Sequence, residues 1–237
     1  MPVLIFAALA HRFALIDTPR MYVTIAIGFG LAFAAVIISA VALYGIWQEG
    51  HSGFSYAIAG AVLGLLILAI PAVGAWRIVT LPRLADITTD TDDPPVFAFA
   101  GQDGARHPPR QSVGDAALQR EAYPDILSHR YPVGVARVLE QARALAAAFD
   151  WHVLDEATPV TADGSARLEA VAMTLLFAVR EDIVIRIEPD GDGSRVDMRS
   201  ASRYLKHDLG SNAKRVRTFM AALDRALAGA VGEGEEE

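Results

Sequence analysis

The sequence contains no cysteine, so disulfide bonds, thiolate metal sites and cysteine nucleophiles are excluded. Basic residues are in deficit as well, with 21 Lys and Arg against 28 Asp and Glu and a net charge of −7. Binding to a nucleic acid needs a clustered basic surface, so no nucleic-acid partner is expected. The chain also lacks a glycine-rich phosphate loop, a G-x-S-x-G motif and any H-x-x-x-H or H-E-x-x-H spacing. We therefore assign no catalytic residue, no metal site and no cofactor.

Charge is nearly absent from residues 21–81, whereas residues 82–237 have the composition of an ordinary soluble sequence. Two apolar runs, 21–47 and 54–79, each exceed the roughly 20 residues that cross the hydrocarbon core of a membrane. Only a short loop, 48–53, joins them. We therefore predict an antiparallel transmembrane helix hairpin over residues 21–81, with membrane lipid as its partner.

The N-terminal segment 1–20 holds a shorter apolar stretch at residues 2–16. Its length is small for a membrane span, and the basic start and small-residue cleavage site of a secretory signal are missing. This stretch either lies in the membrane interface or forms part of a third transmembrane helix.

The soluble half divides into three parts by composition. Residues 82–122 contain the acidic and proline-rich string Thr88-Thr-Asp-Thr-Asp-Asp-Pro-Pro95, which predicts a linker. An apolar patch within it, residues 96–100, is expected to dock onto the domain that follows. Residues 123–229 are expected to form that domain, and the acidic residues 230–237 are predicted to be a disordered tail.

Within residues 123–229 the apolar spacing predicts two helices and four strands. The first helix opens at Pro132 and ends near Asp150, and the last runs over 209–228 with Asp208 as its N-cap. Short turns favour an antiparallel sheet with both helices on one face. The predicted fold is therefore a transmembrane hairpin followed by an α-β-β-β-β-α domain of the α+β class. The strands are expected at 151–159, 167–179, 183–188 and 195–203, with Arg180-Glu-Asp182 as a turn.

The last two predicted strands can be aligned by their apolar residues. Placing Glu188 opposite Arg195 keeps the isoleucines of one strand on the same face as the apolar residues of the other. This register puts Arg186 opposite Asp197 on the other face.

Guanidinium groups, hydroxyls and a helix N-terminus gather at the end of this hairpin, a combination that suits an anion. An alternative is purely structural, with Arg186–Asp197 as a cross-strand pair, Asp208 as a helix cap, and Arg199 or Arg203 paired with Glu169 or Asp182. The candidate anion-binding residues are Arg186, Asp197, Arg199, Ser200, Ser202, Arg203, Asp208, Asn212 and Arg215.

Several strings, which together extend over about residues 82–228, resemble the signature of the uncharacterised DUF1499 family. They are Asp182-Ile-Val-Ile-Arg186, Arg195-Val-Asp-Met-Arg-Ser-Ala-Ser-Arg203 and Asp208-Leu-Gly-Ser-Asn-Ala-Lys-Arg215, with Leu81-Pro-Arg-Leu-Ala-Asp-Ile-Thr-Thr-Asp90, Asp93-Pro-Pro95 and Tyr123-Pro-Asp125 upstream. Members similar to this chain carry N-terminal membrane helices, often three, and others are lipoproteins or lumenal proteins. The resemblance implies a multi-pass protein of the inner membrane with its domain facing the periplasm, and it implies no particular activity.

The distribution of basic residues favours the opposite topology. The loop 48–53 has no Lys or Arg, while Arg12, Arg20, Arg77 and Arg83 lie at the other ends of the helices. The positive-inside rule would therefore place the domain in the cytoplasm. Because this bias amounts to a few charges, we give the resemblance precedence.

Three functions remain open at this point. The leading hypothesis is a non-enzymatic, membrane-anchored envelope module that binds an anionic group or a protein partner. An alternative is an enzyme acting on an acidic or phosphorylated envelope substrate, with Asp182 or Asp208 as the base. A third is a structural subunit that makes contacts through the patch 96–100 and through the GxxxG motif of Gly60 and Gly64, although one such motif among many glycines is more often incidental.

Overall fold

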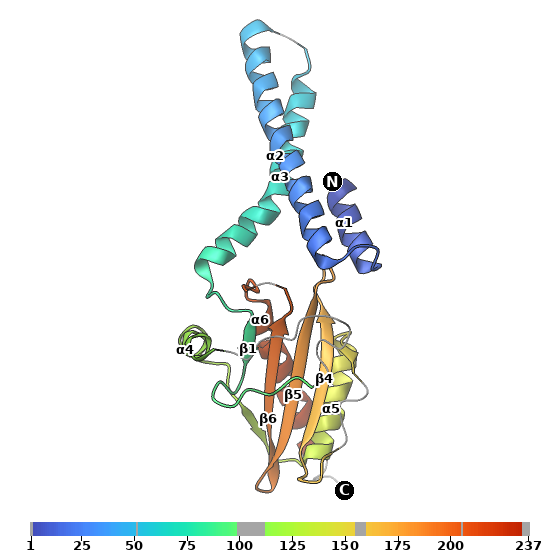
Figure 1. Cartoon of the computed structure of the whole chain (residues 1–237), viewed down its shortest axis with the longest axis vertical. Coiled ribbons are helices and arrows are strands. Elements are labelled where there is room, and N and C mark those ends of the chain that lie inside the picture. The colour runs from blue at the N-terminus through green and yellow to red at the C-terminus, as the bar shows by residue number, and fades with distance from the viewer. Residues whose placement is uncertain (1, 51, 99–111, 155–159, 205, 234–237) are drawn as a thin grey trace. The chain divides into compact units, whose positions relative to one another are not determined.

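The computed structural model describes residues 2–50, 52–98, 112–154, 160–204 and 206–233. The chain forms two compact units, labelled by element in Figure 1. The helical unit comprises Met1–Thr80 and Thr174–Val179, and the sheet unit comprises Leu81–Met173 and Arg180–Glu237.

The helical unit contains α1 (Pro2–Arg12), α2 (Thr18–Glu49) and α3 (Phe54–Thr80). The helix α2 begins where the Asp17 carboxylate accepts a hydrogen bond of 2.9 Å from the backbone N–H of Arg20. It ends at Glu49 and is capped by Gly50, whose φ of 67° lies in the left-handed region that glycine adopts without strain. The predicted pair of long apolar helices is therefore confirmed.

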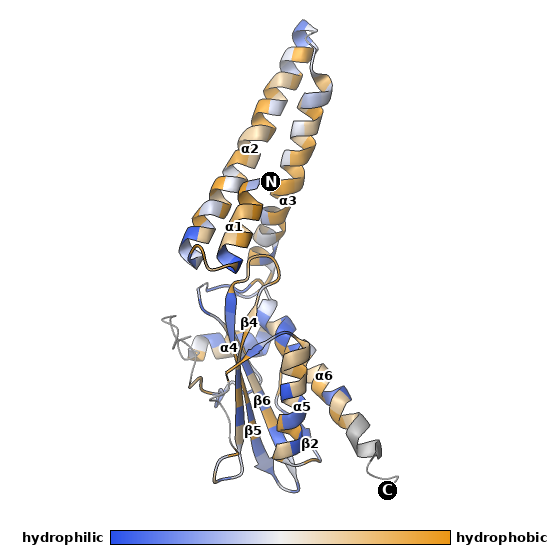
Figure 2. Ribbon diagram, turned by 90° about the vertical axis from the view of Figure 1, so that its right-hand side faces the viewer, coloured by the Kyte–Doolittle hydropathy of each residue, from blue (hydrophilic) through white to orange (hydrophobic). Residues whose placement is uncertain are grey.

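Both α2 and α3 are long and apolar enough to cross a membrane. Hydrophobic residues predominate along both ribbons (Figure 2), and many of them, such as Ile38 and Leu66, are exposed. The 27 residues of α3 extend about 40 Å at 1.5 Å per residue, which exceeds a hydrocarbon core of about 30 Å. The 11 residues of α1 extend only about 16 Å.

Two glycines let α2 and α3 approach each other closely. A Cβ atom at Gly64 would lie 2.5 Å from a methyl group of Val36, and one at Gly60 would lie 2.6 Å from the Ser39 hydroxyl. Both distances are shorter than non-bonded contacts allow. The GxxxG motif is therefore a packing surface between the two helices, and the incidental interpretation is wrong.

The sheet unit is built on an antiparallel sheet of six described strands in the order β1-β6-β5-β4-β3, with β2 also paired to β6. The helices α5 and α6 pack on one face, where Phe219, Leu168 and Ile185 are fully buried. This arrangement confirms the predicted α+β class. The elements are β1 (Asp86–Thr88), α4 (Val113–Ala122), β2 (His129–Tyr131), α5 (Val135–Ala148), β3 (His152–Val153), β4 (Ala166–Met173), β5 (Arg180–Asp190), β6 (Gly193–Ser202) and α6 (Ser211–Glu233).

The segment 82–122, expected to be a linker, contributes β1 and α4 to the folded unit. Ile87 is fully buried, and it lies opposite Ser200 in the pairing of β1 with β6. The Gln119 side chain pairs with the backbone of β1. It accepts a hydrogen bond of 3.1 Å from the Thr88 N–H and donates one of 2.6 Å to the Thr88 carbonyl oxygen. Three strand residues are too few to show an alternating pattern in the sequence, so the linker interpretation missed them.

Other boundaries shift for identifiable reasons. The residues Arg180-Glu-Asp182, predicted as a turn, open β5 instead: all three pair with β4, and Glu181 and Asp182 also pair with β6. The strand predicted at 151–159 is reduced to β3, and residues 155–159 lie outside the described residues. The last helix runs from Ser211 to Glu233, so it includes the first residues of the predicted tail, while 234–237 are not described.

The register of the last hairpin agrees with the prediction. Glu188 lies opposite Arg195, and Arg186 lies opposite Asp197. The alternation of apolar residues was therefore sufficient to align β5 with β6, because a slip by one residue would turn the isoleucines of β5 away from the core.

We expect Gly64→Leu to destabilise the helix pair by about 1–3 kcal/mol, because the new side chain meets Val36 across the interface. Thermal unfolding of the detergent-solubilised chain, followed by circular dichroism, measures this change. Gly74→Leu on the same helix is the matched control, since nothing lies within 4 Å of its added Cβ. Equal loss of stability in both variants would contradict the packing role of Gly64.

Candidate functional site

Polar side chains of β5 and β6 separate onto the two faces of the sheet. Ile183, Ile185 and Ile187 face the core, so Asp182 and Arg186 point to the opposite face by alternation. We call this opposite surface the ion-pair face. It carries Asp182, Arg186, Arg195, Asp197, Arg199 and Arg203.

Asp197 is fully buried at the centre of the ion-pair face. Its carboxylate accepts hydrogen bonds from Arg186 at 3.0 Å and Arg195 at 2.9 Å, and from the hydroxyls of Thr89 and Ser128. Burial alone would raise the pKa of Asp197, but the bonds from Ser128 and the two arginines outweigh burial and lower this pKa below its usual value. Asp197 is therefore held as a carboxylate by four different parts of the chain.

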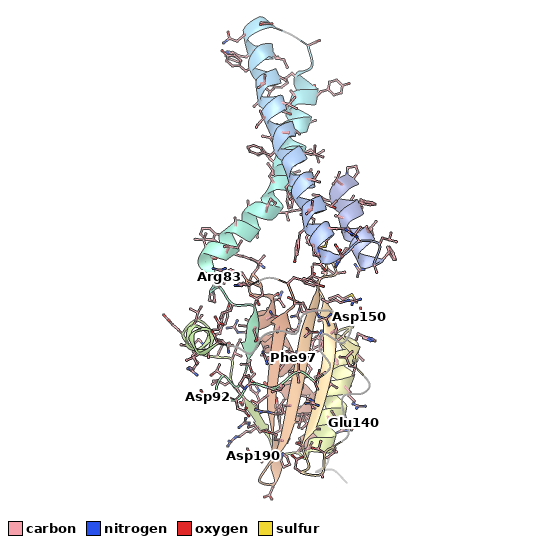
Figure 3. All side chains as sticks on the ribbon, viewed as in Figure 1. Arg83, Asp92, Phe97, Glu140, Asp150 and Asp190 are labelled. Carbon is pink, nitrogen blue, oxygen red and sulfur yellow. The ribbon has the colours of Figure 1, made fainter. Side chains whose placement is uncertain are left out.

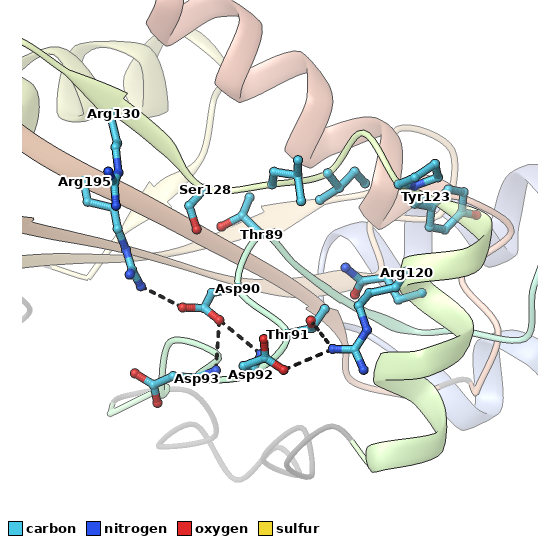
Figure 4. Close-up of a pocket in the computed structure, with 14 residues that line it drawn as sticks. Thr89, Asp90, Thr91, Asp92, Asp93, Arg120, Tyr123, Ser128, Arg130 and Arg195 are labelled. Atoms are coloured by element: carbon cyan, nitrogen blue, oxygen red, sulfur yellow. Dashed lines mark hydrogen bonds and ion pairs between the residues drawn. The ribbon is translucent and has the colours of Figure 1, made fainter.

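The same two arginines hold a turn formed by residues 90–93, which we call the 90–93 turn. The Asp90 carboxylate accepts from Arg195 at 2.7 Å and from Arg186 at 3.3 Å. Its other oxygen accepts the backbone N–H groups of Asp92 and Asp93 at 3.1 and 2.9 Å. One carboxylate thus closes the turn and attaches it to the sheet (Figure 4).

Arg199 is held by the segment that includes β1 and the residues after it. Its guanidinium group makes two hydrogen bonds to Asp86, at 2.9 and 2.6 Å, and donates to the Pro95 carbonyl at 3.0 Å. The guanidinium carbon also lies 4.8 Å from the centre of the Phe97 ring, the residue labelled over the sheet in Figure 3. The described part of the patch 96–100 therefore docks onto the sheet, as expected, while residues 99 and 100 lie outside the described residues.

The structural alternative is confirmed for four of the candidate residues. Arg186 and Asp197 form the cross-strand pair, and the buried Arg203 bonds Asp182 at 2.7 Å. Asp208 is a cap, because its side chain accepts the backbone N–H groups of Gly210 and Asn212 at 2.9 and 2.7 Å. Burial raises the pKa of Asp208, against the effect of these two bonds.

The remaining candidates form a second cluster at the N-terminal end of α6. Arg215 donates to the Ser200 hydroxyl at 3.0 Å and pairs with the buried Glu181. Asn212 accepts from Ser200 at 2.8 Å and donates to Ser202 at 3.0 Å. The sheet thus divides the predicted anion site into two clusters, and carboxylates are already present in both.

An open pocket of about 740 Å³ lies beside the ion-pair face, between the 90–93 turn and residues 123–130 (Figure 4). Three arginines reach it, and two are exposed, with 52% of the Arg120 side chain and 73% of the Arg130 side chain accessible. None of the nine candidate residues is among its described lining residues. Those lining residues are Thr89, Asp90, Thr91, Asp92, Asp93, Gln119, Arg120, Tyr123, Pro124, Ile126, Leu127, Ser128, Arg130 and Arg195.

Sequence reasoning missed these residues because they lie in segments without a regular pattern. The 90–93 turn was assigned to the linker, and Arg120 precedes the predicted domain. A usable signal was present in Tyr123-Pro-Asp125, which belongs to the strings that resemble the family.

A smaller cavity of about 150 Å³ includes His129 and Asp224 in its wall. Asp224 accepts a hydrogen bond of 2.8 Å from the Tyr131 hydroxyl and lies 2.8 Å from Nδ1 of His129. Burial, followed by the contact with Asp224, raises the pKa of Tyr131. These contacts join β2 to α6.

Among the described residues, no group of three or more His, Asp or Glu side chains is arranged to hold a metal ion.

We expect Arg203→Met to lower the free energy of unfolding by about 3–5 kcal/mol, because Asp182 loses its buried guanidinium partner. The double variant Asp182→Asn/Arg203→Met should recover part of this loss. Denaturant unfolding, followed by the fluorescence of Trp151, which stacks on Phe219 in the core, measures both changes. Arg137→Met on α5 removes an exposed charge and serves as control; a loss as large as that of Arg203→Met would contradict the buried-pair argument.

The sheet unit corresponds to a known family over most of its length. The profile of the family described as "Protein of unknown function (DUF1499)" matches residues 86–223. The match begins at the first residue of β1, so it includes the 90–93 turn and the pocket residues, and it covers more than half of the chain. No curated protein and no solved structure matches the chain. The chain belongs to the DUF1499 family, whose function is unknown.

Proposed function

We propose that this protein is a non-enzymatic binding module of the cell envelope, anchored in the inner membrane by α2 and α3 and open to an acidic ligand in the pocket beside the ion-pair face. The observation that carries the proposal is the pair of exposed guanidinium groups, Arg120 and Arg130, at a pocket of about 740 Å³. Each makes a surface ion pair, Arg120 with Asp92 at 3.1 Å and Arg130 with Asp190 at 3.0 Å, and exposed pairs of this kind contribute little energy, so a ligand anion can replace them. Pockets that bind small molecules commonly have volumes of about 300–1,000 Å³.

The walls of the pocket suit a ligand with an acidic and an apolar part. A guanidinium group presents planar donors that match carboxylate and phosphate oxygens. Tyr123, Ile126 and Leu127 add apolar surface, and the Leu127 side chain is largely exposed. An acidic amphiphile, such as a phospholipid headgroup with its chains, has both chemistries.

The buried arginines of the ion-pair face are not proposed to contact the ligand. Arg199 and Arg203 are bonded to carboxylates, and a ligand anion would have to displace those carboxylates inside the protein. Arg186 and Arg195 hold the 90–93 turn, which forms one wall of the pocket. Their charges therefore support the shape of the pocket.

The geometry supports binding better than the enzymatic alternative. Asp182, one of the two candidate bases, is buried and bonded to Arg203, and Asp208 caps α6. Neither the 740 Å³ pocket nor the 150 Å³ cavity has Asp182, Asp208 or Arg199 among its described lining residues.

We expect the double variant Arg120→Gln/Arg130→Gln to weaken binding of a short-chain phosphatidic acid by at least about 100-fold, because two charge-assisted hydrogen bonds are lost at about 1.5–3 kcal/mol each. Isothermal titration of the full chain in a nonionic detergent measures the affinity. Arg137→Gln is the control of equal charge type on α5, outside the pocket. Absence of binding to the wild-type chain, or equal weakening by the control, would contradict the proposed site.

The proposed topology places the sheet unit in the periplasm, as the family resemblance implies. We expect a C-terminal alkaline phosphatase fusion to be active and a C-terminal green fluorescent protein fusion, exported through the same pathway, to be dark. The reverse result would place the sheet unit in the cytoplasm, where the four arginines at the helix ends would obey the positive-inside rule.

A further inference from the structure

The loop Thr174–Val179, which connects β4 to β5, belongs to the helical unit. Phe177 and Val179 pack against the buried residues Ala7, Met21 and Ile25. The loop therefore has a packing partner within the two most N-terminal helices, although it is remote from them in sequence.

A histidine attaches this loop to the junction of α1 and α2. Nδ1 of His11 lies 2.6 Å from the Phe177 carbonyl oxygen, and Nε2 of His11 lies 2.9 Å from the Thr18 hydroxyl. Thr174 closes the loop, since its backbone N–H donates to the Val179 carbonyl and its hydroxyl accepts from the Val179 N–H, at 2.9 and 3.0 Å. The loop thus has a defined position at the residues where α2 begins.

The tip of the loop is apolar and exposed. Leu175 is 85% accessible and Leu176 is 65% accessible. The turn that joins β5 to β6, at the other end of β5, has the sequence Asp190-Gly-Asp-Gly193, which is the polar and glycine-rich composition expected of a hairpin in water. The two ends of the same strand therefore present opposite chemistries.

More apolar residues are exposed on the connection between α1 and α2, next to the attachment point of the loop. Phe13 and Leu15 are both largely accessible. Two exposed charged residues, Arg12 and Arg20, flank this connection in the sequence. Apolar side chains beside arginines are typical of the level where lipid headgroups meet acyl chains.

We infer that the tip of the β4–β5 loop, through Leu175 and Leu176, inserts into the lipid interface together with Phe13 and Leu15. The occupant of this apolar surface is lipid, because the surface is continuous with α2, one of the two helices that are long and apolar enough to cross a membrane. The inference rests on the proposed membrane anchoring. It adds a lipid contact that comes from the middle of the family domain.

The depth of insertion follows from the attachment. His11 bonds the loop at the start of α2, and the charged Arg20 lies in the first turn of that helix. The loop is therefore placed at the headgroup level, where amphipathic segments bury their apolar side chains by about 5–10 Å. A deep position in the hydrocarbon core is not expected for Leu176.

The absence of cysteine from the chain allows a direct test. Leu176→Cys is labelled with an environment-sensitive nitrobenzoxadiazole dye, and the full chain is reconstituted in phosphatidylcholine vesicles. Lipids with a nitroxide near the headgroup should quench the emission of the dye at 176, because a dye buried by about 5–10 Å lies close to that level. Leu31→Cys on α2 lies about 16 Å along the helix from Arg20 and is the reference deep inside the membrane, read with lipids that carry the nitroxide near the end of an acyl chain. Asp192→Cys in the β5–β6 turn is the reference in water, which neither lipid should quench.

The outcomes separate this inference from the anchoring proposal. Quenching at positions 31 and 176, with none at 192, supports the inserted loop. Quenching at 31 with position 176 behaving like 192 overturns the insertion and leaves the anchoring intact. A blue-shifted dye at 176 that lipid nitroxides do not quench would mean that protein covers the tip, which also overturns it. An unquenched dye at 31 would refute the anchoring itself, and the insertion with it.

Discussion

The buried carboxylate of Asp197 is the interaction on which the rest of the sheet unit depends. It accepts hydrogen bonds from β5, from β6, from the residue after β1 and from the residue before β2, through Arg186, Arg195, Thr89 and Ser128. Without this charge, the guanidinium groups of Arg186 and Arg195 would lose the buried carboxylate that holds them side by side, and only their bonds to the 90–93 turn would offset their mutual repulsion. Asp197 therefore positions the two arginines that hold the 90–93 turn, which forms one wall of the pocket.

The two faces of the sheet stabilise the fold by different means. On one face, apolar residues such as Phe219 and Ile185 pack beneath α5 and α6, and their removal from water supplies the main favourable term. On the other face, the Coulomb energy of ion pairs such as Arg203–Asp182 is largely offset by the cost of removing both charges from water, so an intact pair adds little net stability. Arg186 meets Asp197 in a single register of β5 and β6, which the apolar face also requires.

This division explains why a cluster that looks like an anion site in the sequence is a poor place for a ligand in the folded chain. Arginine, serine and asparagine side chains are suited to bind phosphate, and they are equally suited to bind buried carboxylates. Here carboxylates from β1, β5 and the 90–93 turn already occupy the arginines of the ion-pair face. The most accessible guanidinium groups, those of Arg120 and Arg130, also pair with carboxylates, of Asp92 and Asp190, but these are surface pairs, and both arginines come from segments outside the predicted site.

The sequence by itself determined the features that repeat locally. Length and lack of charge identified α2 and α3, alternation aligned β5 with β6, and the polar strings identified the family. Only the tertiary structure decided that Asp86–Thr88 is a strand, that Arg180-Glu-Asp182 continues β5, and that Thr174–Val179 leaves the sheet to pack on helices. In each case the deciding partner is remote in the chain: Arg199 for Asp86, Arg203 for Asp182 and His11 for Phe177. Local sequence patterns do not indicate such partners, because a contact between two residues that are remote in sequence stabilises the chain only once folding has brought them together.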